Sequence, residues 1–226
     1  GRHYSGSNKA LVEAAKYLAL FHKAMLRFPN IEKVKLVKGE VYPFNWETLQ
    51  RLKDIACREN GEFNRFIIRI IEVIHSNSAL EVHLDKSFDS VIGHFDWHPH
   101  NLLFKENEEL VGILDFDLIE YSERLRDVAT AMHKISRVFG ERTELKSEVG
   151  ASLHDRCRLF LDTYNKIYPL NKEEISAIPA FIYDGIRKKL QYILSKHFFS
   201  RDPSSNFDLR KQLTQLYELD IIGQFK

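Results

Sequence analysis

The 226-residue sequence predicts an α+β protein that is mainly α-helical and has one small β element near its middle. Apolar residues recur at helical spacing over long stretches on both sides of residues 90–114, which indicates amphipathic helices. Inside that segment, two short apolar runs at 102–104 and 110–114 flank the polar turn 105–109. Such a pattern is typical of a β-hairpin.

The half of the chain before the hairpin predicts three helices. Ser7 and Asn45 are candidate N-caps, and Asn60-Gly61 is a C-terminal signal. The predicted elements are, in order, a helix from Ser7 to about Phe28, a short extended piece at 33–42, a helix from Asn45 to about Gly61, and a helix at 62–75.

From residue 76 onward, a polar and irregular segment leads into the short strands, and helices then continue to the end. Residues 76–90 predict a loop, and residues 90–94 predict a short strand. The helices that follow are expected at about 122–139, 146–167, 172–199 with a break near Pro179, and 206–222.

Composition limits the classes of function. Hydrophobic residues make up 44% of the chain and charged residues 29%, as in a globular protein with a sizeable core. Because 33 basic side chains balance 32 acidic ones without a basic stripe, we expect no nucleic acid partner. Charges interrupt the apolar runs, and the first residues lack a signal peptide's apolar core, so we expect no membrane span. With Cys57 and Cys157 in no metal or disulfide spacing, a cytoplasmic protein is expected.

The residues that can carry chemistry fall beside the predicted hairpin. His94, Asp96 and Asn101 form an H-x-D-x-x-x-x-N pattern, and Asp115 ends the apolar run 111–115. Phosphoryl transfer requires a carboxylate for the attacking hydroxyl and oxygen ligands for magnesium. Asp96 suits the first role, and Asn101 and Asp115 suit the second. The hairpin would return Asp115 beside Asn101.

Residues 91–131 resemble the aminoglycoside phosphotransferase and choline kinase-like family, a branch of the protein-kinase-like fold. The family's H-G-D-x-H-x-x-N loop is similar to His94-Phe-Asp96-Trp-His98-Pro-His-Asn101, with Phe95 in place of the glycine and His100 in place of a small residue. The family's I-D-F/W-E/D segment looks like residues 114–117, its D-L-A helix start like 127–129, and its L-A-x-x-H helix end like 18–22.

This resemblance implies specific roles for the matching residues. Asp96 would be the catalytic base or orienting carboxylate, and His94 would hold the loop through hydrogen bonds. Asn101 and Asp115 would bind Mg²⁺ that bridges the phosphates of ATP, and Asp117 would either assist a second ion or lie behind the ligands without contacting the metal. The acceptor would be a hydroxyl of a small molecule, held in part by the late helices.

Two further residues have supporting roles in this interpretation. Asp127 would tie the helix after the hairpin to the catalytic loop. His22 is expected to be a buried histidine of the core rather than a reactive group.

The resemblance also implies a domain organisation. Residues 1–6 are expected to be a hinge or linker remnant, and residues 7–226 a protein-kinase-like C-terminal lobe with a small central β-hairpin carrying the catalytic loop. The ten glycines form no glycine-rich phosphate loop, and no V-A-I-K-like strand occurs. The N-terminal ATP-clamping lobe is therefore expected to be absent, and the isolated chain is expected to bind Mg·ATP poorly and to turn over negligibly.

Two other functions remain as alternatives. In a zinc-dependent hydrolase, the alternating residues His94, Asp96, His98 and His100 would share one face of a straight strand and bind the metal. Pro99 argues against such a strand. In a non-catalytic binding or regulatory module of the same fold, the chain would serve as a scaffold. The catalytic and metal-binding residues, which such relatives usually lose, are all present.

Overall fold

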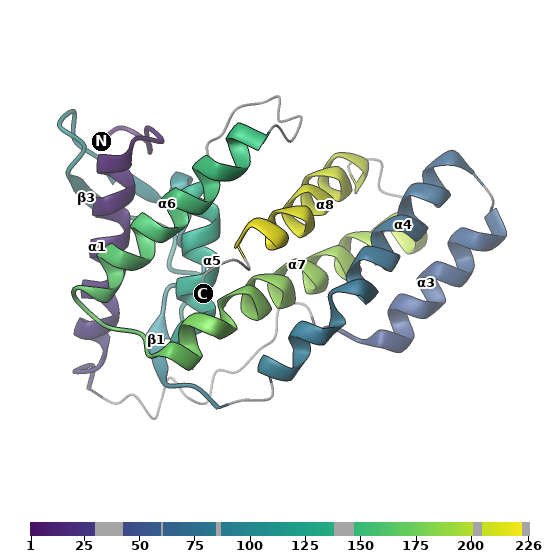
Figure 1. Cartoon of the computed structure of the whole chain (residues 1–226), viewed down its shortest axis with the longest axis horizontal. Helices are drawn as coiled ribbons and strands as arrows, with labels where there is room; N and C mark the ends of the chain where they lie inside the picture. Colours follow the sequence, from purple (N-terminus) through teal and green to yellow (C-terminus); the bar gives the residue numbers. More distant parts are fainter. Residues whose placement is uncertain (30–42, 60, 85–86, 138–146, 201–204, 223–226) are drawn as a thin grey trace.

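The computed structural model describes residues 1–29, 43–59, 61–84, 87–137, 147–200 and 205–222. Long helices surround a small β region, so the prediction of a mainly α-helical α+β fold is confirmed. In Figure 1, the β region lies at one end of the long axis and the α3–α4 pair at the other. The extended piece expected at 33–42 lies outside the described residues.

The helices of the first part of the chain occur where the sequence predicts them. α1 (Asn8–Met25) begins after Ser7, whose side chain accepts a hydrogen bond from the backbone N–H of Ala10. α3 (Trp46–Glu59) and α4 (Glu62–Ser76) pack against each other, and α1 packs against α6 (Ser147–Asn165). The expected loop after α4 instead contains a short 3-10 helix, η1 (Ser78–His83).

The β region consists of two antiparallel pairs. β2 (Leu102–Phe104) and β3 (Leu110–Ile113) form the predicted hairpin, in which Leu102 faces Ile113. β1 (Ser90–Gly93) pairs with β4 (Glu120–Glu123), a strand that the sequence analysis did not predict. The helix expected from residue 122 therefore starts two residues later, as α5 (Arg124–Ser136). The sequence of β4 is polar and all four residues are half-buried, so it lacks the alternation that marks a strand.

The two last helices form the middle of the molecule. α7 (Lys172–Ser200) runs along α8 (Ser205–Ile222), and α7 also packs on α5 (Figure 1). The predicted break near Pro179 is wrong, because α7 is continuous through this residue. A proline inside a helix costs about 3 kcal/mol, and burial of the surrounding residues between neighbouring helices offsets that cost.

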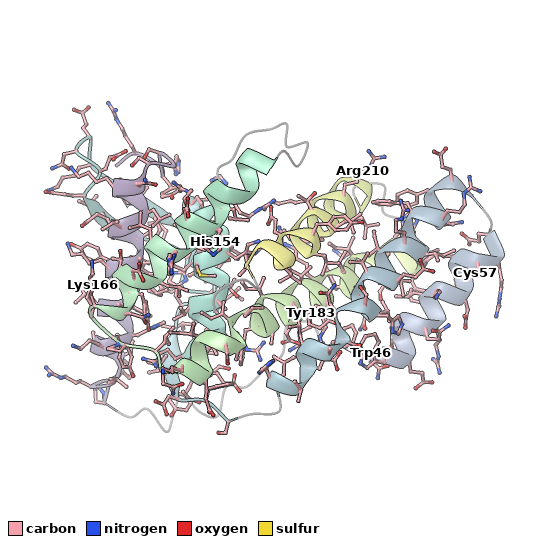
Figure 2. All side chains as sticks on the ribbon, in the orientation of Figure 1. Trp46, Cys57, His154, Lys166, Tyr183 and Arg210 are labelled. Carbon is pink, nitrogen blue, oxygen red and sulfur yellow. The ribbon has the colours of Figure 1, made fainter. Side chains whose placement is uncertain are left out.

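One continuous core joins these elements and anchors the loop formed by residues 94–101. Tyr183, labelled in Figure 2, is fully buried on α7 and donates a hydrogen bond to the carbonyl of Ile74 on α4, at 2.9 Å. Trp97, which follows Asp96 in the chain, is also fully buried and belongs to the same core. The loop 94–101 is therefore held in place by an apolar side chain of its own, that of Trp97. Among the described helices, none has the length and apolar character needed to cross a membrane.

Candidate active site

The candidate site begins where β1 ends and the chain turns at Phe95. This residue has φ 57°, in the left-handed region that glycine adopts without strain. The family that the loop resembles has glycine at this position, so Phe95 keeps the same turn at a cost of about 1 kcal/mol. The turn also requires Gly93, because an added Cβ there would lie 2.7 Å from the Phe95 ring and 2.8 Å from Asp127 Oδ2.

Asp127 joins the first turn of α5 to this loop. Its Oδ2 atom accepts a hydrogen bond from the backbone N–H of His94 at 2.7 Å, and Oδ1 accepts one from the N–H of Phe95 at 3.1 Å. The side chain is 1% exposed. Buried donors and acceptors are costly when unpaired, so these contacts fix the loop against α5.

Behind Asp127 lies a buried chain of two further polar side chains. His22 Nε2 is 3.1 Å from Asp127 Oδ2, and His22 Nδ1 is 2.8 Å from the hydroxyl of Tyr164. A carboxylate only accepts, so Nε2 carries a proton and donates to Asp127, while Nδ1 and the Tyr164 hydroxyl share the second hydrogen bond of the ring. Burial raises the pKa of Tyr164, which keeps the hydroxyl protonated. His22 lies in the core, as the sequence analysis expected.

His94 connects the loop 94–101 to the segment after β3. Its Nε2 atom donates to the carbonyl of Leu114 at 3.0 Å, and its Nδ1 atom accepts from the backbone N–H of Asp96 at 3.3 Å. Both ring nitrogens are therefore engaged in a neutral imidazole. The backbone N–H of Leu114 donates to the carbonyl of Asn101 at 2.8 Å, which brings the segment carrying Asp115 against the loop.

Asp96 is the half-buried carboxylate at the centre of these contacts. Lys134 Nζ lies 3.1 Å from Oδ1, and Asn101 Nδ2 and His98 Nε2 lie 2.9 and 3.2 Å from Oδ2. Partial burial raises the pKa of Asp96, but the hydrogen bond from His98 and the charge of Lys134 outweigh it. The net pKa lies well below the usual range. Asp96 is therefore an ionised acceptor at neutral pH.

The expected magnesium ligands lie on the two connected segments. Asn101 is almost fully buried, and its Nδ2 atom donates to the backbone carbonyl and the carboxylate of Asp96, so its amide oxygen remains for other ligands. Asp115 and Asp117 are exposed, and Asp115 has φ 60°. Magnesium prefers oxygen ligands and retains several waters, so one amide and one or two carboxylates fit it.

The geometry does not support the zinc-hydrolase alternative. Residues Pro99–Asn101 form a 3-10 helix, η2, instead of continuing a strand. His94 uses both ring nitrogens within the protein, and His98 Nδ1 accepts from the backbone N–H of His100 at 3.1 Å. Throughout the described ranges, no group of three or more His, Cys, Asp or Glu side chains is arranged to hold a metal ion.

Two residues of the site were missed by the sequence analysis. Lys134 contacts Asp96, and its position on α5 is seven residues after Asp127. Residues seven apart share one face of a helix, so this spacing could have identified Lys134. Tyr164 comes from α6, and nothing in its local sequence points to His22.

A polar loop after a short strand, a hairpin that returns the segment with Asp115 to this loop, and a surrounding helical lobe define a protein-kinase-like fold. The description of one family model, "Phosphotransferase enzyme family", fits this class, and the model matches residues 1–162. The chain belongs to this phosphotransferase family. A comparison with curated protein sequences finds no match.

Solved structures show the same fold at low sequence identity. An aminoglycoside phosphotransferase from Alicyclobacillus acidocaldarius subsp. acidocaldarius DSM 446 is 18% identical, with a TM-score of 0.70 over 96% of this chain and 65% of that one. The AMP-bound spectinomycin phosphotransferase APH(9)-Ia is 15% identical, with a TM-score of 0.60 over 97% and 67%. The amicoumacin kinase hAmiN, in complex with AMP-PNP, Ca²⁺ and Ami, is 14% identical, with a TM-score of 0.57 over 100% and 64%. The chain thus spans about two thirds of their lengths.

Proposed function

We propose that this chain is the C-terminal lobe of a cytoplasmic, ATP-dependent small-molecule kinase that transfers the γ-phosphate of ATP to a substrate hydroxyl. The observation that carries the proposal is the ionised carboxylate of Asp96, which Asn101 contacts at 2.9 Å and Lys134 at 3.1 Å. Phosphoryl transfer needs positioning and charge neutralisation, and this arrangement offers both.

In this proposal Asp96 accepts a hydrogen bond from the substrate hydroxyl. This contact orients the hydroxyl oxygen toward the phosphorus of the γ-phosphate. Because the pKa of Asp96 is low, the carboxylate orients the hydroxyl in the ground state and takes the proton only as the bond to phosphorus forms. His94 holds Asp96 through its backbone N–H, and Asp127 holds His94. These residues keep the carboxylate in one orientation.

Asn101 and Asp115 are proposed to hold Mg²⁺, with Asp117 as a further carboxylate ligand. Bound there, the ion neutralises charge on the phosphates of ATP. The nucleotides in the spectinomycin phosphotransferase and amicoumacin kinase structures, and the Ca²⁺ in the latter, support a nucleotide and a divalent cation as ligands. Within this chain, the hydrogen bond from the Leu114 N–H to the Asn101 carbonyl holds the segment that carries Asp115 against the segment that carries Asn101.

The proposal includes a longer parent protein whose N-terminal lobe clamps ATP, with residues 1–6 as the hinge and 7–226 as the C-terminal lobe. Support comes from the site's surroundings, since several large apolar side chains beside Asp115 are exposed: Leu114, Phe116, Leu118 and Ile119. Exposed apolar residues gathered in one segment are typical of a surface that another part of a protein covers. Without that lobe, turnover of this chain is expected to be negligible.

The decisive measurement is ADP release by the parent polypeptide with Mg·ATP and pooled hydroxyl metabolites and aminoglycosides. Asp96→Asn is expected to reduce acceptor-dependent ADP release at least 100-fold. Asp155 is exposed on α6, and Asp155→Asn is expected to leave ADP release unchanged. ATP binding without release in any pool would favour the non-catalytic binding module. Absence of ATP binding would refute the kinase proposal.

A further inference from the structure

The imidazole of His98 lies between the Asp96 carboxylate and the backbone of the same loop. His98 Nε2 is 3.2 Å from Asp96 Oδ2, and the His98 side chain is only 24% exposed. On the other side of the ring, Nδ1 accepts a hydrogen bond from the backbone N–H of His100 at 3.1 Å, and this contact caps η2. The two ring nitrogens of His98 therefore face two different partners.

The contact with His100 determines which nitrogen of His98 carries a proton. A backbone N–H group can only donate a hydrogen bond, so Nδ1 is the nitrogen without a proton. The proton of the ring then lies on Nε2, because the hydrogen bond at one nitrogen of a histidine fixes the tautomer at the other. Since a carboxylate only accepts, the Nε2–H group of His98 and the Oδ2 atom of Asp96 are a matched donor and acceptor.

The donors around Asp96 are divided unevenly between its two oxygens. Oδ2 faces Nε2 of His98 at 3.2 Å and Nδ2 of Asn101 at 2.9 Å. Oδ1 faces Nζ of Lys134 at 3.1 Å, and the described part of the chain supplies this oxygen with no second donor. Each carboxylate oxygen has two lone pairs. Both are therefore occupied at Oδ2, whereas one remains open at Oδ1.

We propose that His98 is a positioning residue of the acceptor site: it occupies Oδ2 of Asp96, so that the substrate hydroxyl binds Oδ1. Lys134 contacts Oδ1 from α5, so the hydroxyl approaches the carboxylate from the side of this helix. Without His98, each oxygen would have one open lone pair, and the hydroxyl could bind at either. This inference rests on the proposed function and adds a residue that selects one orientation of its acceptor.

This selection affects the rate because phosphoryl transfer depends on alignment. A displacement of the reacting atoms by about 1 Å can cost about 100-fold in rate. The two oxygens of one carboxylate are farther apart than that distance. A hydroxyl held at Oδ2 of Asp96 would therefore be unproductive, even though its hydrogen bond is equally good.

Capping of η2 is the other role open to His98, and it uses only Nδ1. Two substitutions separate the roles, because they retain opposite ends of the imidazole. The amide oxygen of Asn can accept from the His100 N–H, as in an Asx-turn, but the side chain is too short to reach Asp96. The NH₂ group of Gln can replace Nε2 as the donor to Asp96. His98→Asn thus keeps the cap and removes the donor, whereas His98→Gln keeps the donor and weakens the cap.

The first measurement is a long-range ¹H–¹⁵N NMR spectrum of this chain with its histidine rings neutral. We expect His98 to be the Nε2–H tautomer, and Asp96→Asn to shift its Nε2 resonance because the acceptor changes. His154 on α6, labelled in Figure 2, is the internal control and should not respond. The Nδ1–H tautomer of His98, or an Nε2 resonance that ignores Asp96→Asn, would overturn the inference.

The second measurement is steady-state ADP release by the parent polypeptide, with Mg·ATP and the pooled hydroxyl metabolites and aminoglycosides. His98→Asn is expected to lower kcat about tenfold with an unchanged KM for ATP, and His98→Gln to stay within about threefold of the wild type. His154→Asn and His154→Gln are the matched controls, because the His154 side chain is 25% exposed, close to the value for His98. A larger loss in His98→Gln than in His98→Asn would assign His98 to the cap and overturn the inference.

Failure of this inference and failure of the proposed function give different results. ADP release that requires Asp96 but is unchanged in His98→Asn keeps the kinase and refutes the positioning role of His98. Absence of release in every pool refutes the kinase, and with it the binding of an acceptor at Oδ1, even where the NMR spectrum places the proton on His98 Nε2.

Discussion

The Oδ2 atom of Asp127 accepts a 2.7 Å hydrogen bond from the backbone N–H of His94, and this contact ties α5 to the loop 94–101. The same carboxylate also faces the N–H of Phe95 and the protonated Nε2 of His22. Three donors thus converge on one buried acceptor. An uncharged or donating group in its place cannot satisfy all of them.

Asp127→Asn is therefore expected to destabilise the protein. An asparagine amide offers one oxygen and an NH₂ group, so at least one of the three donors loses its acceptor, at a cost of about 2 kcal/mol. Urea unfolding of this chain, followed by circular dichroism, measures the change. Asp155→Asn on the exposed face of α6 is the control and should unfold like the wild type. An equal midpoint for both variants would contradict the role of Asp127.

The 2.8 Å hydrogen bond between the Tyr164 hydroxyl and His22 Nδ1 leads to a second prediction. Tyr164→Phe keeps the aromatic ring and removes only the hydroxyl, so the fully buried imidazole loses a partner. We expect a loss of about 1–2 kcal/mol of unfolding free energy, together with a shift of the ¹⁵N resonance of His22 Nδ1. Tyr17→Phe, a half-buried tyrosine on α1, is the control. An unchanged nitrogen shift would mean that the hydrogen bond is not formed.

The parts of this fold that the sequence predicted are those that local residues determine. The β2–β3 hairpin joins strands that are neighbours in the chain, and Asp96 and Asn101 are five residues apart. β4 was missed because its pairing with β1 depends on residues about thirty positions away, which no local pattern records. Pro179 was misinterpreted for the same reason, since packing on α5 and α8 outweighs its local preference.

The candidate site follows the same division. The positions of His94 and Asn101 follow from the loop pattern, whereas the contact of Lys134 with Asp96 depends on how α5 packs against the loop. The left-handed turn at Phe95 was also not predictable from the residue itself, because bulky side chains disfavour that conformation. Tertiary contacts, including those of Asp127, impose it.

Gly93→Ala tests how closely the loop approaches β1. A Cβ at this position would lie 2.7 Å from the Phe95 ring and 2.8 Å from Asp127 Oδ2, so one of them must move. We expect Gly93→Ala to lower the free energy of unfolding by about 1–3 kcal/mol, as measured by urea unfolding. Adding Phe95→Gly removes the first conflict and leaves the second, so the double variant should recover part of the loss. Gly185→Ala on α7, where a Cβ meets nothing within 4 Å, is the control. Full additivity of Gly93→Ala and Phe95→Gly would contradict the close contact.

The low pKa of Asp96 gives a prediction with a defined sign. Burial raises this pKa, but the hydrogen bond from His98 and the charge of Lys134 together lower it by more than burial raises it. The pKa of Asp96 in the folded protein therefore lies below that of an Asp in the unfolded chain, which is about 4. The stabilisation from these contacts is therefore complete above about pH 4 and is lost as the pH falls from there through the folded pKa. Lys134→Met removes one of the two causes, so the ¹³C carboxyl resonance of Asp96 should titrate at a higher pH than in the wild type. Lys172→Met should leave the midpoint unchanged. If both variants titrate with the wild-type midpoint, the ammonium group of Lys134 does not act on Asp96 in solution.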